Sequence, residues 1–358
     1  MNPYEELKKR ALPPLRSREE MKEILQREVY GYLPTCPCEI IVSEPTSVEA
    51  RFALGAVSQS YVTMTLSIGG RAHAFRVDRM LHTDGKKRPL VIVANLHPMT
   101  SSQYFPREEM SEYDADYLLF CYKDVSSDDG DFENGLAPLL LPYGQNTDTA
   151  CGKIGIWAYA AMRVLDYGLT LDGTDAKNVA IVGHSRLGKT ALFTGMMDER
   201  FRFVFSNAAG CAGDALAHGK SGHTREPHVY KLGELYEDIY GNFPFWFCKN
   251  FKRYTEKNLS EDFDQHYLLA TIAPRCVLVG SCSEDLWADP ISQQLCALAA
   301  GEAWEAKGLS GLVGCDRILD PEEELLDGNV GFFKIRSLHF LSRHCWRRFM
   351  CFLEKHKR

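Results

Sequence analysis

The chain lacks the long apolar runs and the excess of positive charge that would point to a membrane or a nucleic acid. None of its runs in 358 residues approaches the roughly eighteen apolar residues of a membrane span. The N-terminal MNPYEELKKR is charged and has no apolar stretch of the kind a secretory signal contains. The net charge is −7, which disfavours a polyanion-binding face. We therefore expect a cytoplasmic protein with no membrane or nucleic-acid partner.

Metal-ligand and disulfide patterns are missing as well. Cys36-Pro-Cys38 has no second ligand pair at zinc spacing, and no His, Asp and Glu residues cluster at such spacing. The twelve cysteines are scattered, and several lie in apolar runs such as YLLFCY (117–122). A chain of this length buries a core large enough to fold without disulfides. We expect buried free thiols, no metal and no cofactor.

What the chain does contain is an alternation of buried strands and helices. Its composition is that of a globular protein, with 45% hydrophobic and 25% charged residues. Continuous apolar runs such as PLVIVANL (89–96), KNVAIVG (177–183) and CVLVGS (276–281) are separated by helix-like segments. This order predicts an α/β fold with a mostly parallel central sheet and helices on both faces.

We expect a single domain over residues 1–358, with two segments outside the α/β alternation. The N-terminal segment 1–85 predicts an amphipathic helix over 17–31 and then a hairpin that turns at Gly69-Gly70. The stretch 211–264 is rich in glycine, histidine and aromatics and interrupts the rhythm. It predicts an insertion over the C-terminal edge of the sheet, where open α/β folds bind ligands.

The segment VAIVGHSRLGKTAL (179–192) permits two incompatible interpretations. Gly183–Thr190 match the phosphate-binding pattern G-x-x-x-x-G-K-[ST] letter for letter. Alternatively, Ser185 is a nucleophile on the sharp turn between a strand and a helix, although Leu187 stands where the pattern G-x-S-x-G has glycine. Gly188 follows directly and supplies the small residue one position later.

The rest of the chain favours the nucleophile. A nucleotide-binding loop needs a strand that ends in an aspartate for magnesium, and Asp124 and Asp285 fit that place poorly. An elbow serine needs an acid and then a histidine downstream. Both follow apolar strands here, in CVLVGSCSEDLWADP and in GFFKIRSLHFLSRH. The chain order therefore predicts a serine hydrolase.

GHSRLGKTAL resembles the G-x-S-R-x-G-K motif of carbohydrate esterase family 15, the glucuronoyl esterases and their bacterial relatives. Four further segments look like parts of proteins in the same group: FPFWFCKNFKRY, DQHYLLATIAPR, SEDLWADP and RSLHFLSRHCW. The likeness runs from about residue 90 to 350 and implies an α/β-hydrolase fold and a serine esterase. Bacterial members are variously labelled glucuronoyl esterase or acetyl xylan esterase.

The resemblance assigns roles to four residues. The nucleophile falls on Ser185, and Arg186 after it would help backbone amides to hold the oxyanion. Lys189 matches a lysine that contacts sugar hydroxyls, and the alternative is that it merely begins a helix. The general base falls on His339, in the loop after GFFKIRS, whereas the rival His344 belongs to the final predicted helix.

The chain departs from the family pattern at the acid. Many relatives carry a catalytic glutamate at the position of Ala208. The acid then falls on Asp285, with Glu284 as the alternative and Asp289 as a weaker candidate. Trp287 matches a region where relatives place a tryptophan that faces the substrate, and plain packing is the other interpretation.

The predicted function is hydrolysis of a carbohydrate ester, glucuronoyl esterase-like, on a small-molecule or oligosaccharide substrate. The same chemistry on a sugar or xylan acetate is the first alternative. A nucleotide-binding P-loop protein and a catalytically inactive relative are alternatives from other classes. Trp246, within FPFWFC, is expected to pack in the core of the insertion, and His184 to be structural. The sequence leaves the oligomeric state open.

Overall fold

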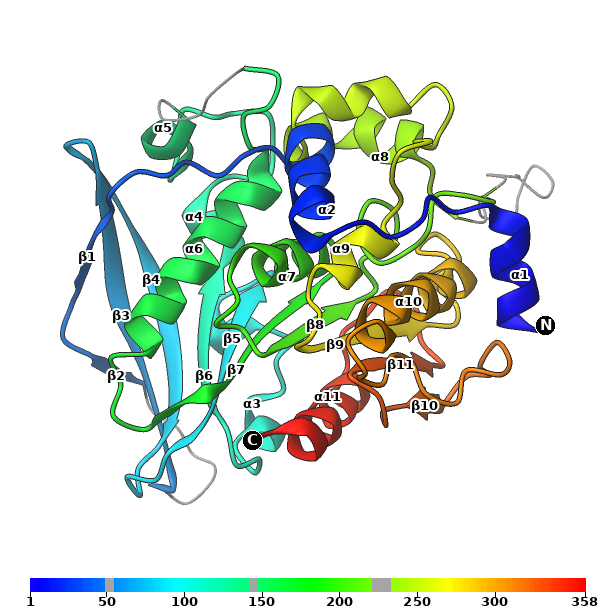
Figure 1. The fold of residues 1–358 in the computed structure, drawn as a ribbon. Helices are drawn as coiled ribbons and strands as arrows, with labels where there is room; N and C mark the ends of the chain where they lie inside the picture. The colour runs from blue at the N-terminus through cyan, green and yellow to red at the C-terminus, as the bar shows by residue number, and fades with distance from the viewer. Residues whose placement is uncertain (49–54, 142–146, 221–232) are drawn as a thin grey trace.

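A single twisted sheet forms the centre of the protein (Figure 1). The structure, a computed structural model, describes residues 1–48, 55–141, 147–220 and 233–358. Eleven strands of the described chain join the sheet, in the order β1-β3-β4-β6-β5-β7-β8-β9-β11-β10, with β2 paired to β3. The strands are β1 Glu39–Val42, β2 Thr46–Val48, β3 Val57–Ile68, β4 Arg71–His82, β5 Arg88–Asn95, β6 Asp116–Cys121, β7 Thr174–His184, β8 Phe203–Asn207, β9 Cys276–Cys282, β10 Glu323–Leu325 and β11 Val330–Ile335.

The six strands from β6 to β11 in this order run parallel, and antiparallel strands flank them on both sides. Every residue of β5 and β9 is buried. Strands covered on both faces have no polar side, which is why they appear in the sequence as continuous apolar runs. The predicted mostly parallel sheet is confirmed.

The predicted hairpin lies on one side of the parallel strands, between β6 and the edge strand β1. Strands β3 and β4 pair from Val57 with His82 to Ile68 with Arg71. The turn lies at Gly69 and Gly70, whose φ angles of 56° and 78° are those of a two-residue hairpin turn. Part of the expected N-terminal segment, residues 49–54, lies outside the described residues.

Helices cover both faces of the sheet (Figure 1). On one face α2, α6, α7, α9 and α10 enclose a core that includes Trp157, Phe193 and Trp304. On the other face α3 and α11 enclose a core with Trp346 and Phe349. The helices are α1 Pro3–Arg10, α2 Arg18–Leu25, α3 Arg107–Met110, α4 Tyr122–Val125, α5 Ala137–Leu140, α6 Lys153–Gly168, α7 Arg186–Met197, α8 Tyr236–Asn242, α9 His266–Ala270, α10 Pro290–Glu305 and α11 Arg343–His356, with short helices η1 Gln26–Tyr30, η3 Met99–Ser101, η5 Pro244–Trp246 and η6 Lys249–Tyr254.

The helix expected over 17–31 is present but divided. Ser17 caps α2, and its hydroxyl and the Glu20 carboxylate each accept a backbone N–H of the other residue. After Leu25 the chain widens into a π-helical turn that ends at Tyr30. The apolar spacing is shared by both parts, so the pattern did not predict the division.

The described part of the stretch 211–264 contains α8, η5 and η6, while residues 221–232 lie outside the description. The backbone of Trp246 lies against Gly152, where a Cβ atom would approach it to 2.4 Å. The Cys248 N–H donates to the Val29 carbonyl at 2.9 Å. These contacts hold the aromatic segment beside the first turn of α6 and next to the elbow helix α7.

All twelve cysteines are free thiols, and nine of them are buried. Their burial agrees with the apolar runs in which several of them stand. In the described part of the chain, no helix combines the length and the apolar character needed to cross a membrane.

Candidate active site

Ser185 stands alone between strand β7 and helix α7. The strand ends at His184 and the helix begins at Arg186. Ser185 has a φ of 59° and a ψ of −126°, a strained backbone conformation for a residue with a side chain. A serine held this way at the carboxyl end of a central strand presents its hydroxyl above the sheet. The predicted elbow geometry is therefore present.

Two glycines make the tight turn possible. A Cβ atom on Gly183 would lie 1.9 Å from the carbonyl oxygen of Leu187. On Gly188 it would lie 2.9 Å from the Ser206 hydroxyl and 3.0 Å from Cβ of Ala209. Leu187 itself is fully buried. The crowded positions are thus 183 and 188, which explains why a large residue is tolerated at 187.

The phosphate-loop interpretation of Gly183–Thr190 is wrong. A phosphate-binding loop needs several residues between strand and helix so that backbone N–H groups can surround the phosphates. Here a single residue makes that connection. Lys189, moreover, is buried in the first turn of α7, and its ammonium donates to the carbonyl of Ala209.

His339 and Asp285 meet across the ends of neighbouring strands. Asp285 follows β9, and His339 follows β11, which pairs with β9. Nδ1 of His339 and Oδ2 of Asp285 are 2.6 Å apart. The Asp285 side chain is buried, whereas that of His339 is 45% exposed and accessible from the pocket. Oδ2 of Asp285 thus fixes Nδ1 of His339, and Nε2 on the other side of the ring can contact other groups.

The rival acids point elsewhere. Glu284 is exposed and accepts a hydrogen bond from its neighbour Ser283 at 3.0 Å. Asp289 caps helix α10, where its carboxylate accepts the backbone N–H of Ser292 at 3.0 Å and the Ser292 hydroxyl at 2.5 Å. Ala208, after β8, supplies no carboxylate.

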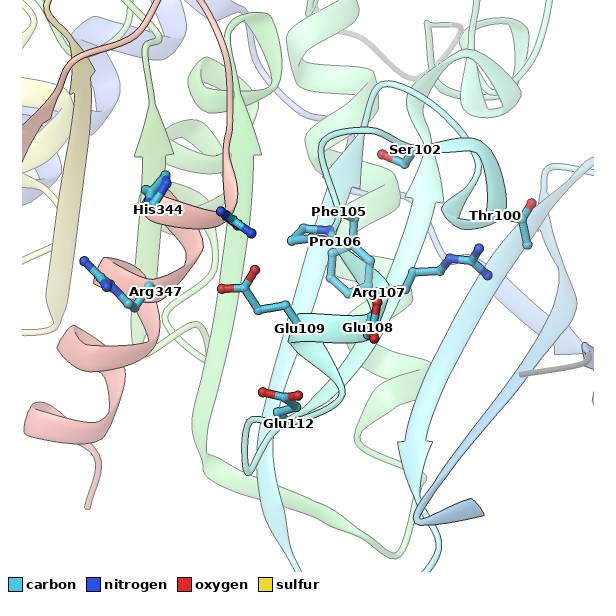
Figure 2. A pocket seen from close by; sticks show the side chains of 11 residues that line it. Thr100, Ser102, Phe105, Pro106, Arg107, Glu108, Glu109, Glu112, His344 and Arg347 are labelled. Carbon is cyan, nitrogen blue, oxygen red and sulfur yellow. The ribbon is translucent and has the colours of Figure 1, made fainter. Parts of the chain in front are cut away.

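The rival histidine also lies elsewhere. His344 is in the first turn of α11 and lines a separate pocket of about 840 Å³, together with Arg347 and with Glu109 of α3 (Figure 2). His339, by contrast, lines a pocket of about 350 Å³ with Ser185 and Asp285. Of the two histidines, the structure brings only His339 together with the elbow serine and an acid.

His184 is the last residue of β7, and its ring lies beside that of His339. Its ring is buried, and its centroid is 4.5 Å from that of His339. Nδ1 lies 2.9 Å from the amide nitrogen of Asn207, and Nε2 has no hydrogen-bond partner among the described residues. Burial, and secondly the proximity of His339, hold the pKa of His184 well below its ordinary value. His184 is therefore a neutral support for the His339 ring.

The pocket beside Ser185 combines aromatic faces with buried charge. The sequence-predicted residues Arg186, Lys189 and Trp287 all line it. The other lining residues are Ala208, Ala209, Gly210, Glu234, Phe243, Trp246 and Ala288, besides Ser185, Asp285 and His339. Trp287 is 40% exposed at the pocket, so it is not packed in the core.

Glu234 is a pocket residue that the sequence did not reveal. Its side chain is buried, and its backbone N–H donates to the Trp287 carbonyl at 2.9 Å. Burial raises the pKa of the Glu234 carboxyl, an effect that the nearby ammonium of Lys189 opposes. Burial likewise lowers the pKa of Lys189, and Glu234 opposes this shift. The two groups therefore support each other's charge inside the pocket.

Arg186 is held from two sides. Its guanidinium pairs with the carboxylate of Asp128, and its carbon atom lies 4.8 Å from the ring centroid of Trp246. Trp246 stacks on Phe243 with a centroid distance of 4.0 Å. Trp246 is buried, as expected for the core of the insertion, and it also forms a wall of the pocket, which the sequence analysis did not predict.

Among the described residues no group of three or more His, Cys, Asp or Glu side chains is arranged to hold a metal ion. The chemistry available at the pocket is that of a serine hydroxyl, an imidazole on a carboxylate, and a nearby guanidinium.

Comparisons with known proteins give a consistent result. The model of the family described as "Glucuronyl esterase, fungi" matches residues 65–308. Carbohydrate esterase MZ0003, from an unknown prokaryotic organism, is 36% identical over 206 residues, which are 57% of this chain and 44% of that protein. The 4-O-methyl-glucuronoyl methylesterase of Podospora anserina is 25% identical over 293 residues, 81% of this chain and 55% of that protein. The chain thus spans about half the length of these curated relatives.

Solved structures agree. A glucuronoyl esterase from Solibacter usitatus superimposes with a TM-score of 0.81 at 26% identity, covering 95% of this chain and 92% of that one. A promiscuous esterase of carbohydrate esterase family 15 from a marine bacterial metagenome has the same TM-score at 25% identity. The predicted α/β-hydrolase fold is confirmed. Since the family model spans well over half of the sequence, the chain belongs to the glucuronoyl esterase family, as the elbow motif predicted.

Proposed function

We propose that the protein is a serine carboxylic-ester hydrolase that cleaves a glucuronoyl-type carbohydrate ester. The observation that carries this proposal is the gathering of Ser185 on a strained elbow with His339, held 2.6 Å from Asp285, in one pocket. These are the parts of a nucleophile, a general base and an orienting acid. The family relationship and the names of the relatives support the same chemistry.

In the proposed reaction, His339 Nε2 takes the proton of the Ser185 hydroxyl as its oxygen attacks the ester carbonyl. Asp285 keeps the other ring nitrogen protonated and stabilises the imidazolium that forms. The tetrahedral intermediate expels the alcohol, which receives the proton from His339. Water then attacks the acyl-enzyme by the same route and releases the carboxylic acid and free Ser185.

Stabilisation of the oxyanion is assigned to Arg186. As the first residue of α7 it has a backbone N–H with no acceptor inside the helix. Its guanidinium is fixed beside the same serine. A donor and a cation already in place act on charge that develops only as the carbonyl is attacked, so they lower the barrier rather than tighten ground-state binding.

The pocket suits one sugar ring that carries the ester. Its volume of about 350 Å³ is at the small end for ligand sites, so a polymer would extend outside it. Trp287 offers an exposed aromatic ring and Trp246 forms part of the pocket wall, while Lys189 and Glu234 offer a buried donor and acceptor for hydroxyl groups. We propose a small-molecule or oligosaccharide uronate ester as the substrate.

The test compares hydrolysis of a benzyl glucuronate ester with that of p-nitrophenyl acetate. We expect uronate turnover by the wild type and a loss of at least about 10³-fold in Ser185→Ala. Ser43→Ala, in the turn after the edge strand β1, is the matched control and should keep full activity. Turnover of the acetate alone would replace the uronate by a sugar acetate. If Ser185→Ala leaves any observed hydrolysis unchanged, the proposal is refuted.

A further inference from the structure

The guanidinium of Arg186 pairs with a carboxylate that belongs to none of the sequence motifs. We propose that Asp128 is a positioning residue for the reaction, whose carboxylate fixes the guanidinium of Arg186 beside Ser185 and ties it to Trp246 of the insertion. The inference rests on the proposed function and deepens it, because it says what makes the oxyanion site rigid.

Asp128 receives three hydrogen-bond donors from three parts of the chain. Oδ2 pairs with Nη1 of Arg186 and accepts the Tyr122 hydroxyl at 2.9 Å. Oδ1 accepts the indole N–H of Trp246 at 2.7 Å. The side chain is only 8% exposed, so these bonds form largely away from water. A carboxylate shared among three donors has little freedom to turn.

The loop that carries Asp128 is held by side chains of helix α6. Lys153, the first residue of α6, is fully buried, and its ammonium donates to the Ser126 hydroxyl at 2.8 Å and to the carbonyl of Asp131. The indole N–H of Trp157 donates to the Ser126 carbonyl at 3.2 Å. The backbone on both sides of Asp128 is therefore bound to α6, which packs against the elbow helix α7.

Arg186 depends on this carboxylate for its orientation. Asp128 is its one ion-pair partner in the described part of the chain, and its Nε atom is buried without a hydrogen-bond partner there. Its other contacts are with Trp246 and Phe243, whose ring centroids lie 4.8 Å and 5.6 Å from the guanidinium carbon. Because these two rings stack with centroids 4.0 Å apart, the guanidinium lies beside the edge of the stack and not over a ring face. A contact at the ring edges does not fix the orientation of the guanidinium, so the ion pair with Asp128 has to do so.

Pairing with Asp128 occupies only part of the hydrogen-bonding capacity of the Arg186 guanidinium. Arg186 has five N–H donors in a planar fork, and Asp128 binds the Nη1 end. The other amino group remains available to an oxyanion at Ser185. The carboxylate weakens the cation's long-range field, but a donor that needs no reorganisation during the reaction contributes more than a free charge.

The experiment is a double-substitution cycle on the 358-residue chain, with kcat and KM measured on the uronate ester. Arg186→Ala should lower kcat about 10²- to 10³-fold. Asp128→Asn should lower kcat about ten- to a hundredfold and change KM less than about threefold, because oxyanion contacts form only in the transition state. In the Arg186→Ala background, Asp128→Asn should lower kcat by less than about threefold.

Asp129→Asn is the matched control. Asp129 stands next to Asp128 in the same loop, where it accepts the Ser127 hydroxyl at 2.5 Å and the Asp131 N–H at 2.9 Å. An asparagine oxygen can accept the same bonds, so kcat should stay within about twofold of wild type. If Asp128→Asn fails to fold, Tyr122→Phe removes one donor of Asp128 and keeps the ring, and it should lower kcat severalfold only while Arg186 is present.

The outcomes separate the two proposals. Additive losses in the double variant, a change confined to KM, or no effect of Arg186→Ala on kcat would each overturn the role of Asp128 while Ser185-dependent hydrolysis stands. Absence of Ser185-dependent hydrolysis in the wild type would overturn the proposed function and this inference together. A non-additive loss in kcat supports the inference, since a merely structural role would weaken both backgrounds equally.

Discussion

Replacing Asp285 by asparagine tests the assignment of the acid most directly. Oδ2 of Asp285 is 2.6 Å from Nδ1 of His339, and its side chain is 6% exposed. The substitution preserves shape but places a neutral amide beside the ring. The imidazolium formed in the transition state then loses its counter-charge, and the ring can adopt the tautomer with the proton on Nε2, which cannot act as a base.

The size of the effect follows from the geometry. Two unit charges at this separation attract by about 6 kcal/mol at an effective dielectric constant of about 20. His339 is 45% exposed, so solvent screens part of this attraction and leaves roughly 4 kcal/mol. That corresponds to about 10³-fold in rate, and the unfavourable tautomer can add up to about another tenfold. We expect Asp285→Asn to lower kcat about 10³- to 10⁴-fold.

The assay is steady-state hydrolysis of the benzyl glucuronate ester, with circular dichroism to verify folding. Glu284→Gln is the matched control, since Glu284 is exposed and bonds to Ser283, and its kcat should stay within about twofold of wild type. A folded Asp285→Asn enzyme that keeps more than about a tenth of the wild-type kcat would refute the reasoning. So would a large loss in Glu284→Gln instead.

Two further predictions concern Ala208, where relatives carry the acid, and His266, which is buried at the start of α9. Adding Ala208→Glu to Asp285→Asn should recover at least about tenfold of the lost kcat, because position 208 lines the same pocket as His339. Ala208 already has a φ of 50°, so a longer side chain there adds no new backbone strain. An unchanged kcat in a folded double variant would contradict this prediction. Burial lowers the pKa of His266, so the unfolded chain binds its proton first as the pH falls below about 6.5, and stability is lost there. We expect the free energy of unfolding, measured by urea titration, to fall between about pH 7 and about pH 5 by up to about 2 kcal/mol less in His266→Gln than in the wild type. Equal decreases in the two proteins would contradict this role of His266.

The central elements were predictable because their physical cause is local. A parallel strand buried on both faces has no alternative to a continuous apolar run, as in β5 and β9. Element ends were less predictable. Helix α7 begins at Arg186, directly after the elbow residue, because Ser185 alone makes the turn through its positive φ. That conformation depends on the packing of Gly183 and Gly188, which no periodicity reveals.

The candidate site was predictable where chain order and strand ends define it. Ser185, Asp285 and His339 each follow an apolar strand, so their approach at one sheet edge could be inferred. Asp128 and Glu234 could not be found in this way. Asp128 stands 58 residues before Arg186 in an acidic loop that looks like solvated surface, and only the tertiary fold gives its carboxylate a partner.

The packing around Gly188 has a consequence for how such proteins are recognised and altered. A side chain at position 188 would collide with Ser206 of β8 and with Ala209 in the loop after it, and not with the turn itself. An elbow of this kind is therefore invisible to a search that demands glycine two positions after the serine. A library of variants should likewise tolerate diversity at Leu187, subject to burial. It should yield almost no folded members with a side chain at 183, and few with one larger than that of alanine at 188.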